Sequence, residues 1–309
     1  MKTVFALSDE YLDYLHSLNY SKKTIRGTRR LLIRFNRYLA CSCQVESVEY
    51  LGSDVLRKWH AHLSGLRTKE GYPLKATGIN RHIVAVRGFL EYLADMGYVR
   101  KQLIKVVPYL KEPKTLPKNV VPHTQMRRLL STIGTDTPEN YRNRAMLELL
   151  YSSGIRSGEL LGLSLADIDI ENRTALVHGK GDKDRVVPIG KTAMRYLETW
   201  IKAVRPYFVR DPQEKALFLT KAGKRLPYSS FHREVASVVK QSGMDVKVTP
   251  HTFRRSCATE LIRGGANLYH VKELLGHESL NTLRPYVKLT IVDLKKTHEN
   301  CHPREKEGS

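Results

Sequence analysis

The sequence predicts a mainly α-helical protein of two domains, with one small antiparallel sheet in the second domain. Apolar residues recur at helical spacing along most of the chain, a proline- and lysine-rich stretch interrupts them near residue 115, and two alternating runs flank a glycine- and charge-rich turn. At 309 residues the chain is long enough for two cores, and its 41% apolar content is ordinary for a globular protein.

The first domain, residues 1–110, is expected to be a bundle of four helices joined by short loops. Ser21 is a favourable N-cap for KKTIRGTRRLLIRFNRYLA, where apolar residues lie at helical spacing and arginines occupy the other faces. A helix is expected after Ser53 in DVLRKWHAHLSG, and another in GINRHIVAVRGFLEYLADMG up to Gly97. A short helix in DEYLDYLHSLNY precedes Ser21.

A linker at residues 111–122 separates this bundle from the second domain, residues 123–309. The surrounding segment PYLKEPKTLPKNVVPH contains four prolines among lysines, so it cannot continue a helix. Beyond it, YRNRAMLELLYSSG is expected to be a helix ending at Gly154, a short helix follows in GELLGLSLADIDI, and TALVHGKGDKDRVVPIG predicts a hairpin. Helices return in KTAMRYLETWIKAV, SSFHREVASVVKQSG, TFRRSCATELIRGG and NLYHVKELLGH.

The chain is strongly basic. Its 52 Lys and Arg against 31 Asp and Glu give a net charge of +21, which is typical of a protein that binds a polyphosphate such as nucleic acid. The alternative is a charged surface that only aids solubility. No apolar run is long enough to cross a membrane, and MKTVFALSDEY turns acidic too early for a signal peptide, so we expect a cytoplasmic protein without membrane contact.

The cysteine pattern indicates neither a disulfide framework nor a metal site. The four cysteines are Cys41, Cys43, Cys257 and Cys301. Their spacing lacks a CxxC pair, and a cytoplasmic chain would keep them reduced. His298 and His302 lie beside Cys301, but no second ligand pair follows at zinc-like spacing, so no metal is expected.

Four separated segments contain residues suited to phosphate chemistry: SSGIRSGELLGL, HGKGDKDRVVPIG, TPHTFRRSCATELIRGG and LLGHESLNTLRPY. Together they resemble the catalytic domain of the tyrosine recombinase, or phage integrase, family. The basic helical first domain and the linker extend the resemblance, to Xer-type members, over nearly the whole chain. The segment GIRSGE alone would be weak evidence for this family. The resemblance depends on all four segments occurring in this order, with a tyrosine at the end of the last one.

The resemblance implies that Arg156, in the RxxE segment, and Arg254, in the HxxR segment, clamp the scissile phosphate. Two guanidiniums suit a pentavalent phosphorane, which carries extra negative charge, and they remove the need for a metal or other cofactor. His251 and His277 resemble the two family histidines that hydrogen-bond the phosphate oxygens and move a proton. Taken singly, each arginine would be read as a surface ion pair and each histidine as a packing residue.

Tyr286 matches the nucleophile of the family, whose attack on a DNA phosphodiester gives a 3′-phosphotyrosine and a free 5′-hydroxyl. Lys180 aligns with the hairpin lysine that protonates the leaving 5′-oxygen, with Lys183 as a rival. If Tyr286 is not the nucleophile, Tyr269 and Tyr228 are the next candidates. Glu159, three residues after Arg156, is expected to hold that arginine in place.

The sequence departs from the family pattern near these residues. Phe253 replaces the usual leucine of HxLRH and Arg255 its final histidine, while residues 282–289 read TLRPYVKL in place of a threonine-rich stretch. None of these changes removes a catalytic group.

The first domain resembles the family's core-binding domain, which clamps the DNA duplex together with the catalytic domain. The arginines expected to contact DNA phosphates are Arg26, Arg29, Arg30, Arg34, Arg81 and Arg87. The expected partner is double-stranded DNA bearing a recombination site, on which four copies of the chain assemble, with or without a second recombinase. The open alternatives are a type IB topoisomerase and a DNA-binding regulator that cuts nothing.

Overall fold

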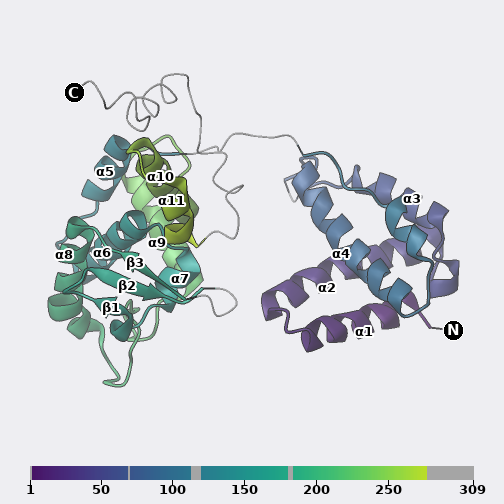
Figure 1. Ribbon diagram of the computed structural model, residues 1–309, viewed down its shortest axis with the longest axis horizontal. Helices are drawn as coiled ribbons and strands as arrows, with labels where there is room; N and C mark the ends of the chain where they lie inside the picture. The colour runs from purple at the N-terminus through teal and green to yellow at the C-terminus, as the bar shows by residue number, and fades with distance from the viewer. Residues whose placement is uncertain (1, 69, 113–119, 180–183, 277–309) are drawn as a thin grey trace, which may run out of the picture. The chain divides into compact units, whose positions relative to one another are not determined.

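A computed structural model describes residues 2–68, 70–112, 120–179 and 184–276. The chain divides into two compact units, residues 1–114 and 115–309, each with its own hydrophobic core (Figure 1). The fold is mainly helical with one small antiparallel sheet, so the predicted fold class is confirmed. In the described part of the chain, no helix combines the length and apolar character that crossing a bilayer requires.

The first unit is built from four α-helices. They are α1 (Val4–Ser17), α2 (Lys22–Tyr38), α3 (Ser53–Leu63) and α4 (Ala76–Asp95), with a π-helical turn at Leu39–Cys43 and 3-10 turns at Val48–Tyr50 and Lys101–Val106. Their apolar faces meet in a core that includes Leu7, Phe35, Trp59 and Phe89. As predicted, Ser21 caps α2, and its hydroxyl accepts a 3.2 Å hydrogen bond from the amide of Thr24.

Three predicted helix starts in this unit were wrong, and one of them is that of α4, which begins at Ala76, two residues before the predicted segment. Helix α1 begins at Val4, well before the predicted segment, because the hydroxyl of Thr3 accepts a hydrogen bond from the amide of Ala6 and forms an N-cap there. Helix α3 begins at Ser53 itself, with Gly52 as the N-cap residue, so Ser53 lies inside the helix and does not cap it.

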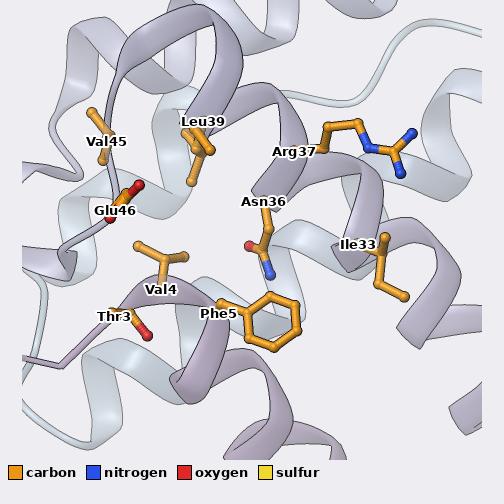
Figure 2. A pocket seen from close by; sticks show the side chains of 10 residues that line it. Thr3, Val4, Phe5, Ile33, Asn36, Arg37, Leu39, Val45 and Glu46 are labelled. Atoms are coloured by element: carbon orange, nitrogen blue, oxygen red, sulfur yellow. The ribbon is translucent and has the colours of Figure 1, made fainter.

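A surface pocket of about 400 Å³ lies between the start of α1 and the end of α2. Figure 2 shows Val4 and Phe5 on one side of it and Ile33, Asn36 and Leu39 on the other. The Phe5 side chain is 58% exposed, so this part of the bundle presents apolar surface to solvent.

The second unit contains seven α-helices within its described residues. They are α5 (His123–Ser131), α6 (Pro138–Ser153), α7 (Ser157–Gly162), α8 (Lys191–Thr199), α9 (Tyr228–Gln241), α10 (Pro250–Arg263) and α11 (Leu268–Leu275), with a π-helical turn at Trp200–Val204 and 3-10 turns at Leu165–Asp167 and Arg205–Phe208. Nine of the 16 residues of helix α6 are buried, and the helix packs against α8 and α10, so it forms the centre of this unit.

The sheet has the order β1 (Ile168–Asp169), β2 (Thr174–Val177) and β3 (Arg185–Pro188), all antiparallel. Ala175 opposes Val187 and Val177 opposes Arg185. Because side chains alternate along a strand, Arg185 shares the inward face of β3 with the fully buried Val187. The sheet therefore directs one arginine toward the interior of the unit.

Candidate active site

The structure describes three of the six predicted catalytic residues. Arg156 lies just before α7, and His251 and Arg254 lie on α10. Lys180, His277 and Tyr286 lie outside the described residues, although Gly276, the residue before His277, is described.

Arg156 is the N-cap residue of α7 and has an extended backbone. Its side chain is 47% exposed, which makes it the most open cation of the site. Nη1 donates to Oε1 of Glu159 at 2.6 Å, and Nη2 donates to the carbonyl oxygen of Gly276 at 2.8 Å. The guanidinium is thus oriented by two contacts while much of its surface faces solvent.

Arg254 lies on the buried face of α10 and is only 4% exposed. Nη1 donates to the carbonyl of Gly154 at 2.8 Å, and Nη2 donates to the carbonyl of Leu275 at 2.5 Å. A buried cation needs such partners, because burial without hydrogen bonds costs several kcal/mol, on the order of the penalty for an unpaired polar group or more. Arg254 thereby connects the end of α6 with the end of α11.

Three arginines bind three consecutive carbonyls at the C-terminal end of α11. Arg185 Nε donates to Leu274 at 3.0 Å, Arg254 to Leu275 and Arg156 to Gly276. We call Arg156, Arg185 and Arg254 the arginine collar.

The last carbonyls of a helix have no partner within the helix, and they form the negative end of its dipole, so three cations suit this position. Glu159 supplies one carboxylate against these three guanidiniums, which leaves excess positive charge among these side chains. The collar therefore combines a fixed geometry with a net attraction for anions.

Glu159 holds two members of the collar, which confirms its predicted role toward Arg156. Its carboxylate also accepts two hydrogen bonds from Arg185, at 3.3 and 2.9 Å, and one from the amide of Arg156 at 2.8 Å. Burial by itself raises the pKa of Glu159, but the hydrogen bonds from Arg185 and Arg156 outweigh it and lower the pKa to about 2. Glu159 is therefore a permanent anion at neutral pH.

His251 and Arg254 are three residues apart on α10, so both side chains lie on the same side of the helix. Although His251 keeps part of its surface open to solvent, partial burial of its ring lowers its pKa, and the charges of Arg255, Arg254 and Arg156 lower it further. His251 is therefore a neutral imidazole near pH 7, able to accept a proton. The charges of Arg254 and Arg156 thus act on the imidazole, which fits the hypothesis that these residues share one site.

Sequence reasoning missed Arg185. One signal was available: in RVVP, strand alternation puts Arg185 on the same face as Val187, and an arginine on the inward face of a strand requires a partner. The hairpin was predicted from its alternating runs and charged turn, and within it only Lys180 and its rival Lys183 were given a role.

The six arginines predicted to contact DNA lie on α2 and α4 of the first unit. Those with exposed side chains are Arg26, Arg29, Arg30, Arg34 and Arg81. Arg29 forms an exposed ion pair with Asp9, 3.0 Å apart. Arg87 instead donates from Nη1 to the carbonyls of Ile104 and Val107, at 3.1 and 3.0 Å, so it has a structural role within the bundle.

A stripe of cations runs along α2. Arg26, Arg30 and Arg34 are spaced four residues apart, which places them on one face of the helix. Helix α2 packs against α4, and Arg34 lies near it, because the charge of Arg34 adds to burial in lowering the pKa of His82 on α4. Arg81, beside His82 in the sequence, is exposed.

The described residues contain no group of three His, Cys, Asp or Glu side chains arranged to hold a metal. The cluster of His298, Cys301 and His302 lies outside them.

Comparisons with known proteins match nearly the whole length of the chain. The model of the "Phage integrase family" matches residues 119–291, and that of the "Phage integrase, N-terminal SAM-like domain" matches residues 8–97. Tyrosine recombinase XerD of Listeria innocua is 33% identical over 303 residues, covering 96% of this chain and 100% of the relative. Tyrosine recombinase XerC of Haemophilus ducreyi is 33% identical over 302 residues, covering 97% and 95%.

Solved structures share the fold. The Tn1549 transposon integrase in complex with a circular intermediate DNA gives a TM-score of 0.76 at 20% identity, covering 97% of this chain and 99% of that chain. The XerH site-specific recombinase bound to a difH substrate gives 0.72 at 22% identity, covering 91% and 80%. These comparisons confirm the family predicted from the ordered motifs: the chain belongs to the phage integrase family, and it is a tyrosine recombinase.

Proposed function

We propose that the chain is a site-specific DNA recombinase that cuts and rejoins strands through Tyr286. The observation that carries the proposal is that Arg156 and Arg254, from two distant stretches of sequence, both donate to carbonyls at the end of α11, with His251 one helical turn before Arg254 on α10. His277 follows that end directly, and Tyr286 follows nine residues later.

The collar suits a phosphodiester in its transition state. The phosphorane gains negative charge on its non-bridging oxygens, and Arg156 and Arg254 would neutralise it with charge-assisted hydrogen bonds. Arg156 is exposed enough to meet a phosphate without unfolding any element, while Arg254 is held rigidly by Gly154 and Leu275. The guanidinium of Arg156 is accessible to solvent, and that of Arg254 is held in place by hydrogen bonds. This arrangement favours docking of a phosphate from the solvent side.

The remaining proposed catalytic residues move protons or bind the phosphate during cleavage. Tyr286 loses its phenolic proton to the neutral imidazole of His251, and its oxygen attacks the phosphorus to form a 3′-phosphotyrosine. The bond from phosphorus to the 5′-oxygen breaks, and Lys180 gives that oxygen a proton. His277 donates a hydrogen bond to a phosphate oxygen. In the second step a 5′-hydroxyl attacks, the protons return and Tyr286 leaves, so rejoining needs no cofactor.

The first unit would bind the duplex through its phosphates. The α2 stripe of Arg26, Arg30 and Arg34, with Arg29 and Arg81 beside it, offers several cations on adjoining helices. Arg87 has one guanidinium nitrogen committed to backbone carbonyls, which leaves it the weakest of the predicted contacts. In this proposal the unit spanning residues 1–110 is the core-binding domain, residues 111–122 are the linker and residues 123–309 are the catalytic domain.

Strand exchange between two duplexes requires four cleavage events, and each chain has a single Tyr286. The assembly we propose is therefore a tetramer formed on two DNA sites in the cytoplasm, either of this chain alone or with a second recombinase.

The proposal is tested with the full chain and fragmented genomic DNA. Covalent complexes are trapped by denaturation, digested and sequenced to identify the site, and a suicide substrate carrying a nick beside that site is then used for single-turnover cleavage. We expect an adduct with wild type, none with Tyr286→Phe, and a rate reduced about 10²–10³-fold with Arg156→Ala.

Other outcomes would point elsewhere. An adduct formed by Tyr286→Phe would remove that tyrosine from its role and direct attention to Tyr269 and Tyr228. Efficient relaxation of plasmids that lack the site would favour a topoisomerase. Specific binding without any adduct would favour a regulator.

A further inference from the structure

Arg185 is fully engaged inside the second unit. Its side chain is 13% exposed, and each of its three guanidinium nitrogens donates a hydrogen bond. Nη1 and Nη2 contact the two carboxylate oxygens of Glu159, and Nε contacts the carbonyl of Leu274 at 3.0 Å. This forked arrangement is specific to arginine, because a lysine has a single donor nitrogen.

These contacts join three segments that each adjoin a proposed catalytic residue. Arg185 itself begins β3, and Lys180 lies in the sequence between β2 and β3. Glu159 belongs to α7 and holds Arg156. Leu274 is two residues from the end of the described chain, where His277 follows. One side chain thus links the hairpin, the Arg156 segment and the end of α11.

The backbone at Gly276 is shaped around this guanidinium. Gly276 has a φ of +62°, and a Cβ there would lie 2.9 Å from Nη1 of Arg185 and 3.0 Å from its Cζ. Any other residue would therefore be strained in its backbone and would press on Arg185. The absence of a side chain at Gly276 lets Arg185 reach the carbonyl of Leu274.

We propose that Arg185 is a positioning residue for the recombination reaction, a role that rests on the proposed function. It keeps the hairpin, Arg156 and the end of α11 in one arrangement and does not contact the phosphate itself. All three of its nitrogens already donate to protein acceptors, so its charge acts through Glu159 and α11.

Removal of Arg185 has two local consequences. Among the residues that the structure describes, Glu159 keeps only Arg156 as a charged partner, so its carboxylate draws that guanidinium into a closer pair and away from the phosphate. The carbonyl of Leu274 loses its donor, so the end of α11, which immediately precedes His277 in the sequence, frays. Both effects reduce cleavage more than they reduce stability.

The test compares Arg185→Ala and Arg185→Lys with a matched control, Arg205→Ala. Arg205 is also buried, at 6% exposure, and donates to the carbonyls of Glu214 and Ala216, neither of which touches the collar. Loss of Arg205 therefore costs stability without disturbing the site.

Two measurements are made on the full chain. The first is hydrogen exchange of peptides covering residues 268–276 without DNA, where Arg185→Ala should exchange at least tenfold faster than wild type, beyond any change in global stability. The second is single-turnover cleavage of the suicide substrate per folded molecule. We expect a loss of tenfold or more for Arg185→Ala, a smaller loss for Arg185→Lys and a wild-type rate for Arg205→Ala.

The outcomes separate this proposal from the previous one. If wild type forms no adduct with any DNA, the recombinase proposal fails, and the role of Arg185 in that reaction fails with it. If wild type cleaves, and the Arg185 variants cleave at the wild-type rate per folded molecule, only the positioning role is overturned. Equal losses in Arg185→Ala and Arg205→Ala would also overturn it. If Arg185→Ala does not fold, the cleavage rate of Arg185→Lys tests the positioning role. This variant keeps the positive charge and loses only the forked set of hydrogen bonds.

Discussion

Arg254 donates a 2.8 Å hydrogen bond from Nη1 to the carbonyl oxygen of Gly154, so a proposed phosphate ligand is anchored by the C-cap of the central helix α6. Gly154 has a φ of +63°, and a Cβ there would lie 2.7 Å from Cδ2 of Leu275 and 3.2 Å from the sulfur of Cys257. The close approach of α6, α10 and α11 at this point therefore requires glycine.

Substitution of Gly154 by alanine should destabilise the protein by more than the backbone strain at its positive φ would cause by itself. Gly243 offers a matched control, because it has the same φ of +63° and a Cβ there would meet no atom within 4 Å. We expect Gly243→Ala to lower the free energy of unfolding by about 1 kcal/mol, and Gly154→Ala to lower it by roughly 1–3 kcal/mol more through overpacking. Urea denaturation of both variants checks this, and equal losses would contradict the packing argument.

The ion pairs of Glu159 should give the protein a distinct acid sensitivity. Its pKa is about 2 in the folded state and about 4.3 in an unfolded chain. A lowered pKa stabilises the folded state above the unfolded value, and this stabilisation is lost as pH falls from about 4.3 toward 2. Because the side chain is 7% exposed, the contribution at pH 7 is on the order of 3 kcal/mol.

Glu159→Gln should therefore be less stable than wild type at pH 7, and the difference should shrink as the pH is lowered toward 3. Denaturant unfolding at a series of pH values measures it, with the exposed Glu171→Gln as the control that follows the wild-type curve. A constant difference between Glu159→Gln and wild type across this range would show that the carboxylate charge is not what stabilises the fold.

The neutral state of His251 should set the acid limit of cleavage. Partial burial and then the charge of Arg255 lower its pKa below the usual value near 6.5, so the imidazole stays unprotonated at neutral pH and charges only in more acidic solution. Cleavage that uses this imidazole as a base should therefore fall only at a pH lower than the ordinary histidine pKa of about 6.5.

Arg255→Gln should move that fall to higher pH, because removal of a nearby positive charge raises the pKa of His251. Single-turnover rates between pH 5 and 8 measure the shift. Arg263→Gln, on the same helix and paired with Glu260, is the control that should leave the profile unchanged. An unaltered profile in Arg255→Gln would argue that another group accepts the proton.

The elements that depend on local chemistry were predictable from sequence. The capping serine Ser21, the stop at Gly154 and the alternation of the hairpin each follow from rules that act within a few residues, and each is found in the structure. The early start of α1 was missed because Thr3 was not recognised as an N-cap, although Val4, Leu7 and Tyr11 already lie at helical spacing. Element boundaries depend on single hydrogen bonds that a spacing pattern does not contain.

The site was predictable only as a set of residue types. Motif order identified Arg156, His251 and Arg254, but neither spacing nor composition indicates that Arg185 shares a carboxylate with Arg156 across 29 residues of chain. The three consecutive carbonyls that accept hydrogen bonds from the collar arginines belong to the backbone. Every residue has such a carbonyl, so the sequence does not indicate which ones are used. Such contacts arise from tertiary packing, and only the folded structure reveals them.

The α2 stripe should contribute to DNA affinity through phosphates and without regard to base sequence. Neutralising one phosphate contact reduces the slope of log K against log salt by about 1 and weakens binding about equally on all sequences. We expect this for Arg30→Ala and for Arg34→Ala. Arg57→Ala is the control, because Arg57 lies on α3 and pairs with Asp54 at 3.1 Å. Fluorescence anisotropy between 50 and 200 mM salt, on a recombination site and on random duplex, measures both quantities. A loss confined to the recombination site would instead mean that these arginines read bases.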